Sequence, residues 1–369
     1  MRWWSLAAVL SLGCSSSRGD GGDNTPPGDE RRPSEAARCS IEDLPGSLGG
    51  SGAGVVAVTR GPRRVLLLRW VGDGEDPSLP PRAQEVAWRW SDGEHAGAVY
   101  TSSSAEPFPR LAWTGAGFLL HHRAGLEWRD RTLEAPRPLR GLLPPGACLV
   151  RLTELAEGAV VTWLSRCDAV DGAEGHALFL GPNGEVRRRV QGLAESQGPA
   201  RLSQLSARWD FGRVVLQGLN VTSGLPQWWL FDGEGERLAD GHGELAACPR
   251  SGCVRVWASG ENGAAVPEEA MLLKVDPLRG GHGFTTNIAA RDVRAVAVSG
   301  DRVLALRSPA AGAGCDLAVV DVARRQVLAD RHEEGLACSE GSVRPTARGF
   351  VVAVTGPQGP RLRALDCAR

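Results

Sequence analysis

The chain has 369 residues and a formal net charge of −1, and its arginines are scattered rather than clustered, which argues against a nucleic-acid partner. Its 48 glycines and 24 prolines indicate many tight turns and argue against a helical bundle. No Gly-x-Ser-x-Gly sequence, phosphate loop or dinucleotide fingerprint occurs in a suitable context. The sequence therefore identifies no catalytic residue and implies no cofactor.

Residues 1–13 have the features of a signal peptide. A short basic start, Met1-Arg2, precedes an apolar run that is too short to span a bilayer. The segment Leu10-Ser11-Leu12-Gly13-Cys14 resembles the lipobox of bacterial lipoproteins, in which a diacylated cysteine becomes the mature N-terminus. The resemblance implies lipidation of Cys14 and attachment to a membrane. Ser15, which follows the cysteine, implies sorting to the outer membrane by analogy with Gram-negative lipoproteins.

The lipobox resemblance departs from the usual pattern in one respect. Ser11 and Leu12 are swapped relative to the order that the pattern has. Ordinary signal-peptide cleavage, which would give a periplasmic or secreted protein, is therefore the alternative. Residues 14–38 are polar, rich in glycine and proline, and unable to bury a core, so they predict a disordered tether ahead of a domain at 39–369.

A short unit recurs throughout the domain. Each copy starts with a glycine that is followed within a few residues by an apolar run, at Gly54, Gly117, Gly158, Gly212, Gly252, Gly300 and Gly349. A second apolar run, a turn rich in Asp, Gly or Asn, and a more polar run follow in most copies, and a further candidate strand lies upstream of most of these glycines. The intervals are uneven, which fits loops of different length on a constant sheet.

Four strands per copy and no credible long helix predict an all-β fold, a β-propeller with seven blades of four antiparallel strands. Six or eight blades remain as alternatives, and a pair of β-sandwich domains is the second architecture. The last copy lacks a strand after Cys367, which the N-terminal end of the domain would supply. Trp228 and Trp229 face opposite sides of their strand by alternation, so one of them is expected to be less buried. The repeat is similar to that of propeller-type lipoproteins in general.

Nine cysteines support export. With Cys14 assigned to lipid, eight remain, an even number that suits an oxidising compartment. Spacing pairs Cys248 with Cys253 across a short turn and Cys148 with Cys167 across a hairpin. Cys39 with Cys367 would join the two ends of the domain and leave Cys315 with Cys338. The alternative pairing of Cys39 with Cys315 and Cys338 with Cys367 stays open.

Histidines recur at similar positions in the repeat. His242, His282 and His332 follow their glycines by 30, 30 and 32 residues, and His95 has a comparable place in the first copy. These offsets predict that the histidines follow the outermost strands on one face, where they could bind a transition metal or an anionic ligand. The competing interpretation, which we favour, is that they share turn chemistry and point to solvent, since metal ligands must converge within bond length.

The sequence thus favours an exported, lipid-anchored β-propeller that works as a binding or interaction platform for a protein or glycan ligand, as a monomer. One alternative is a metal-assisted hydrolase or lyase that uses the histidine-bearing face. A second is a purely structural protein of the cell envelope.

Overall fold

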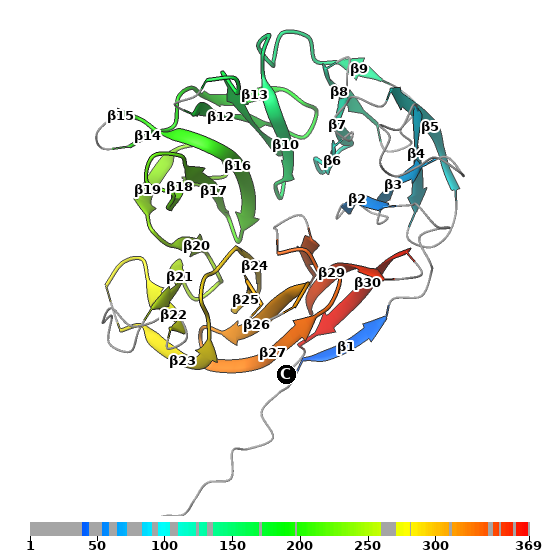
Figure 1. Cartoon of the computed structure of the whole chain (residues 1–369). Helices are drawn as coiled ribbons and strands as arrows, with labels where there is room; N and C mark the ends of the chain where they lie inside the picture. Colours follow the sequence, from blue (N-terminus) through cyan, green and yellow to red (C-terminus); the bar gives the residue numbers. More distant parts are fainter. Residues whose placement is uncertain are drawn as a thin grey trace, which may run out of the picture. The chain divides into compact units, whose positions relative to one another are not determined.

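The computed structural model describes a domain made almost entirely of β-strands (Figure 1). It describes residues 39–43, 54–58, 65–71, 83–90, 95–103, 110–122, 125–130, 136–169, 172–195, 198–259, 271–280, 282–309, 312–338, 342–346, 348–356 and 359–367. The predicted signal peptide at 1–13, Cys14 and the predicted tether at 14–38 lie outside the described residues. Within the described residues, no helix has the length and apolar character that crossing a bilayer requires.

The first three sheets follow one another in chain order, and each has four antiparallel strands. They are formed by β2 (Gly54–Val58), β3 (Val65–Val71), β4 (Ala83–Trp90) and β5 (His95–Ser103); by β6 (Arg110–Trp113), β7 (Phe118–His122), β8 (Gly125–Arg129) and β9 (Arg137–Pro138); and by β10 (Cys148–Glu154), β11 (Ala159–Ser165), β12 (Ala173–Leu180) and β13 (Val186–Val190). A small hairpin of β14 (Ala194–Glu195) and β15 (Gly198–Pro199) follows.

The next three sheets repeat the arrangement. They are formed by β16 (Arg201–Asp210), β17 (Arg213–Asn220), β18 (Pro226–Asp232) and β19 (Arg237–His242); by β20 (Leu245–Ala247), β21 (Val254–Ser259), β22 (Leu272–Pro277) and β23 (Phe284–Ala289); and by β24 (Ala295–Ser299), β25 (Arg302–Arg307), β26 (Cys315–Asp321) and β27 (Gln326–Glu333). A short antiparallel contact between β12 and β16 joins the third and fourth four-stranded units into one eight-stranded sheet.

The seventh sheet is built from both ends of the domain. Strands β28 (Val343–Pro345), β29 (Gly349–Gly356) and β30 (Gly359–Asp366) come from its C-terminal end, and β1 (Ser40–Asp43) pairs with β30 as the fourth strand. In Figure 1 the sheets succeed one another around a common centre. The fold is therefore an all-β propeller of four-stranded antiparallel blades, as the repeats predict, and β1 supplies the strand that the last repeat lacks.

The turn between β18 and β19 illustrates how the sequence sets a blade. The Asp232 carboxylate accepts hydrogen bonds from the backbone N–H groups of Glu234 and Glu236 at 3.0 and 2.8 Å. Gly235 adopts a φ of +89°, which a residue without Cβ tolerates best. Local turn chemistry therefore reverses the chain and fixes the register of β19 on β18.

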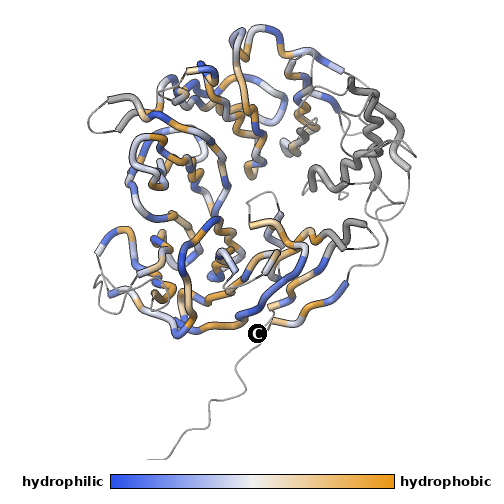
Figure 2. The backbone as a smooth tube through the Cα atoms, viewed as in Figure 1, coloured by the Kyte–Doolittle hydropathy of each residue, from blue (hydrophilic) through white to orange (hydrophobic). Residues whose placement is uncertain are grey.

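The core lies between neighbouring blades. Phe179 of β12 and Phe231 of β18 pack across one blade interface with their ring centroids 5.7 Å apart. Figure 2 accordingly shows hydrophobic residues spread through all the sheets that it colours. The expected difference between Trp228 and Trp229 is wrong, because they are 4% and 1% exposed. Both faces of a blade are covered by neighbouring blades, so alternation directs each indole into a different interface.

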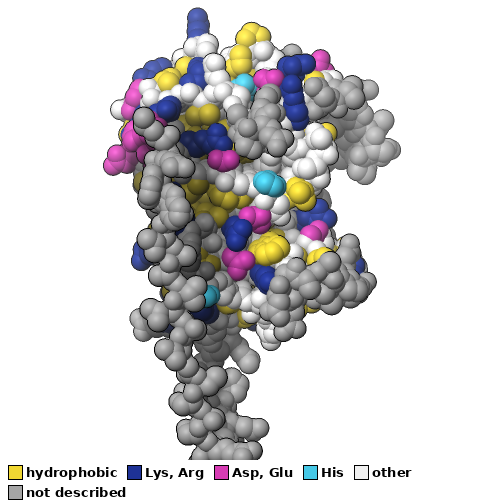
Figure 3. Space-filling model, turned by 90° about the vertical axis from the view of Figure 1, so that its left-hand side faces the viewer, with side chains coloured by type: hydrophobic (Ala, Val, Ile, Leu, Met, Phe, Trp, Pro, Cys, Tyr) yellow, Lys and Arg dark blue, Asp and Glu magenta, His cyan; other side chains and the backbone are white. Residues whose placement is uncertain are grey.

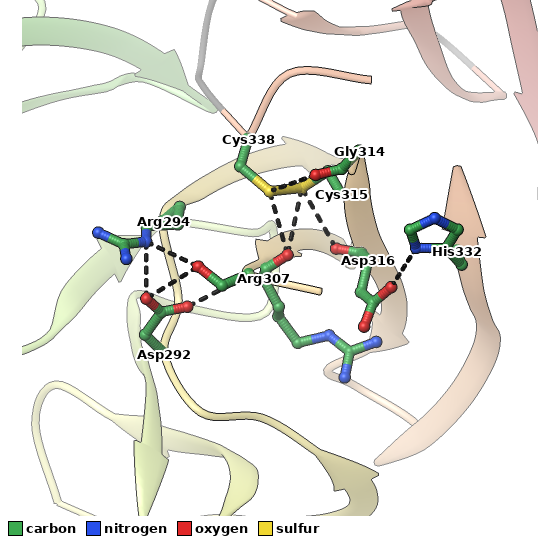
Figure 4. The surroundings of a disulfide bond; sticks show 9 residues. Asp292, Arg294, Arg307, Gly314, Cys315, Asp316, His332 and Cys338 are labelled. Carbon is green, nitrogen blue, oxygen red and sulfur yellow. Dashed lines mark hydrogen bonds and ion pairs between the residues drawn. A yellow bond between two sulfur atoms is a disulfide. The ribbon is translucent and has the colours of Figure 1, made fainter. Parts of the chain in front are cut away.

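Four disulfides connect the described cysteines. They join Cys148 with Cys167, Cys248 with Cys253, Cys39 with Cys367, and Cys315 with Cys338. The structure thus forms the end-to-end pair rather than the alternative pairing. Figure 4 shows Cys315 and Cys338 beside the Arg307 carbonyl oxygen, 3.3 and 3.1 Å from their sulfur atoms. This disulfide content is consistent with an exported protein.

Candidate functional site

The interface between the fourth and fifth blades, which we call the 4–5 seam, has a much smaller apolar core than its neighbours. Its cluster of buried residues has five members, Val215, Trp228, Leu230, Ala246 and Cys248. The clusters that join the third blade to the fourth and the fifth to the sixth have 14 members each. The 4–5 seam therefore has fewer fully buried apolar side chains than the interfaces on either side of it.

A cleft of about 1390 Å³ lies along the 4–5 seam. One wall comes from the fourth blade, with the β16–β17 turn, Trp228 and Leu230 of β18, and residues 238–242 of β19. The other comes from the fifth blade, with the β20–β21 turn and the β22–β23 connection, and Val322, Ala323 and Arg325 of the sixth blade extend it. Figure 3 views the side of the molecule on which β18, β19 and β21 to β23 lie in Figure 1, where basic, histidine and hydrophobic side chains occur together.

The cleft is strongly basic. Five arginines line it, and the only acidic residues of its lining are Asp240 and Glu244, which leaves a charge of +3 with neutral histidines; the arginines are Arg213, Arg250, Arg255, Arg279 and Arg325. Glu244 pairs with Arg255 at 3.2 Å, and Asp240 pairs with Arg237 at 2.9 Å. Both carboxylates of the lining are therefore neutralised locally. Among the residues that the structure describes, the other four arginines form no ion pair.

Two of these arginines are oriented by neighbouring groups. The Arg250 guanidinium lies over the Phe211 ring, 5.0 Å from its centroid. Arg325 donates a hydrogen bond from Nη2 to the His282 carbonyl oxygen at 2.9 Å. A cation–π contact and a neutral carbonyl hold a guanidinium without neutralising its charge. Both guanidinium groups therefore keep their positive charge within the cleft.

A buried ion pair closes the inner end of the 4–5 seam. Arg208 Nε donates to both carboxylate oxygens of Asp210 at 2.9 Å, and its terminal nitrogens donate to the carbonyl oxygens of Val296 and Ala246. Asp210 accepts from the Cys248 N–H at 3.1 Å. Since these partners lie on or beside the innermost strands β16, β20 and β24, one guanidinium connects three successive blades.

The four histidines that were predicted to share one face do not all occupy the same position in their blades. His242 ends β19 and His332 lies near the end of β27, both outermost strands, as expected. His282 instead precedes the outermost strand β23, and His95 is the first residue of β5. The expectation that all four follow outermost strands is wrong for these two. In the fifth blade the cause is loop length, since residues 260–271 separate β21 from β22 whereas residues 221–225 separate β17 from β18.

The described histidine side chains of this set do not converge. His242 and His282 both line the cleft, one from the end of β19 in the fourth blade and the other from the β22–β23 connection in the fifth. His332 lies on β27 of the sixth blade, and its Nδ1 forms a hydrogen bond with Asp316 Oδ1 at 2.8 Å (Figure 4). The side chain of His95 lies outside the described residues. Within the part of the chain that the structure describes, no three His, Cys, Asp or Glu side chains form a group that could hold a metal ion.

A serine–histidine contact that we did not anticipate lies on the β11–β12 hairpin. Ser165 Oγ and His176 Nε2 are 2.7 Å apart, and His176 Nδ1 accepts a hydrogen bond from the Gly192 N–H at 3.2 Å. Because Nδ1 is the acceptor, a neutral imidazole carries its proton on Nε2 and donates it to the serine. Burial lowers the pKa of His176 below 6.5 and supports this neutral form. The histidine therefore orients the hydroxyl and does not activate it as a base.

The sequence patterns did not identify the arginines of the cleft as candidate site residues. Arg213 directly follows Gly212, Arg250 lies in the turn between Cys248 and Cys253, and Arg279 follows Pro277-Leu278 at the end of β22. They are dispersed over a long stretch of chain, so no local cluster marks them. The available signal was their position: each lies near a turn between strands, and turns of successive blades meet at one edge of the fold.

Comparisons with known proteins agree on the fold. No family model and no curated protein matches the chain. Acylaminoacyl peptidase from Pyrococcus horikoshii has a similar structure, at 10% identity and a TM-score of 0.52 over 86% of this chain and 53% of the peptidase. An acylaminoacyl peptidase in complex with a chloromethyl ketone gives 10% identity, a TM-score of 0.52, and coverage of 85% and 51%. This chain spans about half the length of these peptidases.

A third solved structure is the β-propeller domain of the Trilobed protease from Pyrococcus furiosus. It is 11% identical, with a TM-score of 0.40 over 85% of this chain and 82% of that domain. The two peptidase structures, at their low identity, bear on the fold alone. The chain is a disulfide-bonded β-propeller with a basic cleft on one blade interface.

Proposed function

We propose that the protein is an exported, lipid-anchored propeller of the cell envelope that binds an anionic ligand in the 4–5 seam. The observation that carries this proposal is the cleft, in which four arginines lack a carboxylate partner among the described residues. Two of the four are held in place by contacts that leave their charge available. Binding needs no cofactor, because the attraction comes from fixed guanidinium groups.

The proposed location is the outer membrane, with the lipid on Cys14. The support is the lipobox-like sequence before Cys14 and the four disulfides, which suit folding in an oxidising compartment. Replacing Cys14 with Ser removes the thiol that would be acylated. We expect the Cys14→Ser protein to move from the membrane fraction to the soluble fraction of cells. Unchanged membrane attachment would contradict the anchor, and the propeller would then be assigned to ordinary export.

The binding role is tested by charge reversal in the cleft. A variant carrying Arg250→Glu and Arg279→Glu changes two arginines that form no ion pair among the described residues, so the propeller is expected to fold. Arg348→Glu is the control, because Arg348 lies outside the cleft and pairs with Asp366 on the seventh blade. After crosslinking in envelope extracts, we expect the wild-type and Arg348→Glu proteins to retain the same bound species and the cleft variant to lose it. Equal retention by all three proteins would refute the cleft as the binding site.

A further inference from the structure

We infer that the anionic ligand is an acidic segment of another protein, bound in extended form as an additional strand on the outer edge of β19. This inference rests on the function proposed above and specifies its ligand. Strand β19 ends the order of its sheet, and no described strand pairs with its outer edge. Residues 238–242 of this edge line the basic cleft. An unpaired strand edge therefore lies beside unpaired positive charge.

The register of β19 shows which backbone groups are available. The Gly243 N–H donates to the Pro226 carbonyl oxygen at 2.8 Å, so residues 226 and 243 are a hydrogen-bonded pair. Antiparallel pairing alternates, and the next such pairs are Trp228 with Gly241 and Leu230 with Ala239. The backbone N–H and C=O groups of Asp240 and His242 consequently point away from β18. They present two donors and two acceptors in the spacing that an extended chain requires.

The opposite side of the cleft selects for acidic side chains. Arg250 and Arg279 come from the turn and the connection of the fifth blade, and Arg325 comes from the sixth. In an added strand, alternate side chains point to one side, so carboxylates at every second position would face these arginines. The residues between them would face away from the fifth blade. A segment with acidic residues at alternate positions could therefore form backbone hydrogen bonds with β19 and ion pairs with the arginines at the same time.

Two features favour a protein segment over an acidic polysaccharide. The cleft is larger than the 300–1,000 Å³ or so typical of small-molecule sites, and it is open along a strand edge whose backbone groups suit another backbone. Sugars are commonly held on exposed aromatic faces, but Trp228 of the lining is 4% exposed, and the exposed Phe211 ring is stacked against Arg250. The third aromatic residue of the lining, Phe284, is half-buried and packs against the core between the fifth and sixth blades. The described aromatic residues of the cleft therefore offer little free ring surface.

The experiment measures binding of a fluorescein-labelled octapeptide of alternating Glu and Val, capped at both ends, to the disulfide-bonded domain. Asp240→Pro removes the outward N–H of β19 without removing a ladder bond to β18. Asp240→Ala is the matched control, because it removes the same carboxylate and keeps the N–H. We expect wild type and Asp240→Ala to bind, and Asp240→Pro to bind about tenfold more weakly than Asp240→Ala. The Arg250→Glu and Arg279→Glu variant should lose at least as much affinity relative to wild type. A Lys and Val peptide should not bind.

The outcomes separate this inference from the proposed function. If Asp240→Pro binds as Asp240→Ala does while the arginine variant fails, the basic cleft stands and the added strand is wrong. If wild type ignores the peptide but binds the acidic polysaccharide polygalacturonate, the ligand class is wrong. If neither probe binds, the proposed function fails as well. Should Asp240→Pro not fold, as judged by circular dichroism, a peptide N-methylated at alternate residues tests the same bonds with the wild-type protein, and equal affinity would overturn the inference.

Discussion

Replacing Arg208 with Met is predicted to destabilise the propeller strongly. Arg208 is 9% exposed and Asp210 1% exposed, so the substitution leaves a buried carboxylate without its cation. The carbonyl oxygens of Ala246 and Val296 lose a donor at the same time. Breaking a buried ion pair by removing one partner costs about 3–5 kcal/mol. We expect a loss of that size in the free energy of unfolding, measured by urea denaturation with tryptophan fluorescence.

Two matched variants test whether loss of the buried ion pair causes this decrease in the free energy of unfolding. Arg348→Met removes an exposed partner of Asp366 and should cost no more than about 1 kcal/mol, since water screens such pairs. The double variant Arg208→Met and Asp210→Leu removes both charges, so it should be more stable than the single Arg208 variant. It should not regain full stability, because the Cys248 N–H loses its acceptor. An Arg208→Met protein no less stable than Arg348→Met would refute the role of the ion pair.

Three further predictions follow from local contacts. Gly241→Ala should lower the free energy of unfolding by about 1–3 kcal/mol, because a Cβ there would lie 2.4 Å from the Trp228 ring. Urea denaturation measures this loss. If the clash causes it, adding Trp228→Leu should restore part of the stability. Burial lowers the pKa of His176, so the stability contributed by its neutral form is present above pH 6.5 and is lost as the pH falls below that value. The urea midpoint should drop with acidification less in His176→Gln than in wild type, and parallel profiles would contradict this. Removing the Cys39–Cys367 disulfide with two serines should cost about 2–5 kcal/mol and speed amide exchange in β1, whereas unchanged exchange would show that strand pairing alone holds β1.

The sequence was sufficient for the blade plan because each blade is a local unit. Glycine before an apolar run, Asp-Gly turns such as Asp232-Gly233, and alternation all act within a few residues, so a single sequence reveals them. The disulfide Cys248–Cys253 was accessible for the same reason. The pairing of Cys39 with Cys367 was one of two alternatives, because their proximity depends on closure of the whole ring.

The cleft could not be predicted from the sequence, because it depends on contacts between blades. Arg213, Arg250 and Arg325 come from three blades, and their convergence follows from how each blade packs on the next, which strand periodicity does not encode. Burial of both Trp228 and Trp229 has the same origin. The histidine prediction failed for His282 because a constant offset along the chain was equated with a constant place in the blade. Loop length breaks that equivalence.

Closure of the seventh blade by β1 has a mechanical consequence. Cys39 immediately precedes β1, and its sulfur is bonded to Cys367 at the end of β30. Tension that arrives along residues 14–38 would otherwise unzip the short β1 ladder one hydrogen bond at a time. With the disulfide in place, that load passes through a covalent bond into the C-terminal strand before it reaches the ladder. A propeller tethered at Cys14, as proposed, could thus be pulled by its anchor without opening its ring.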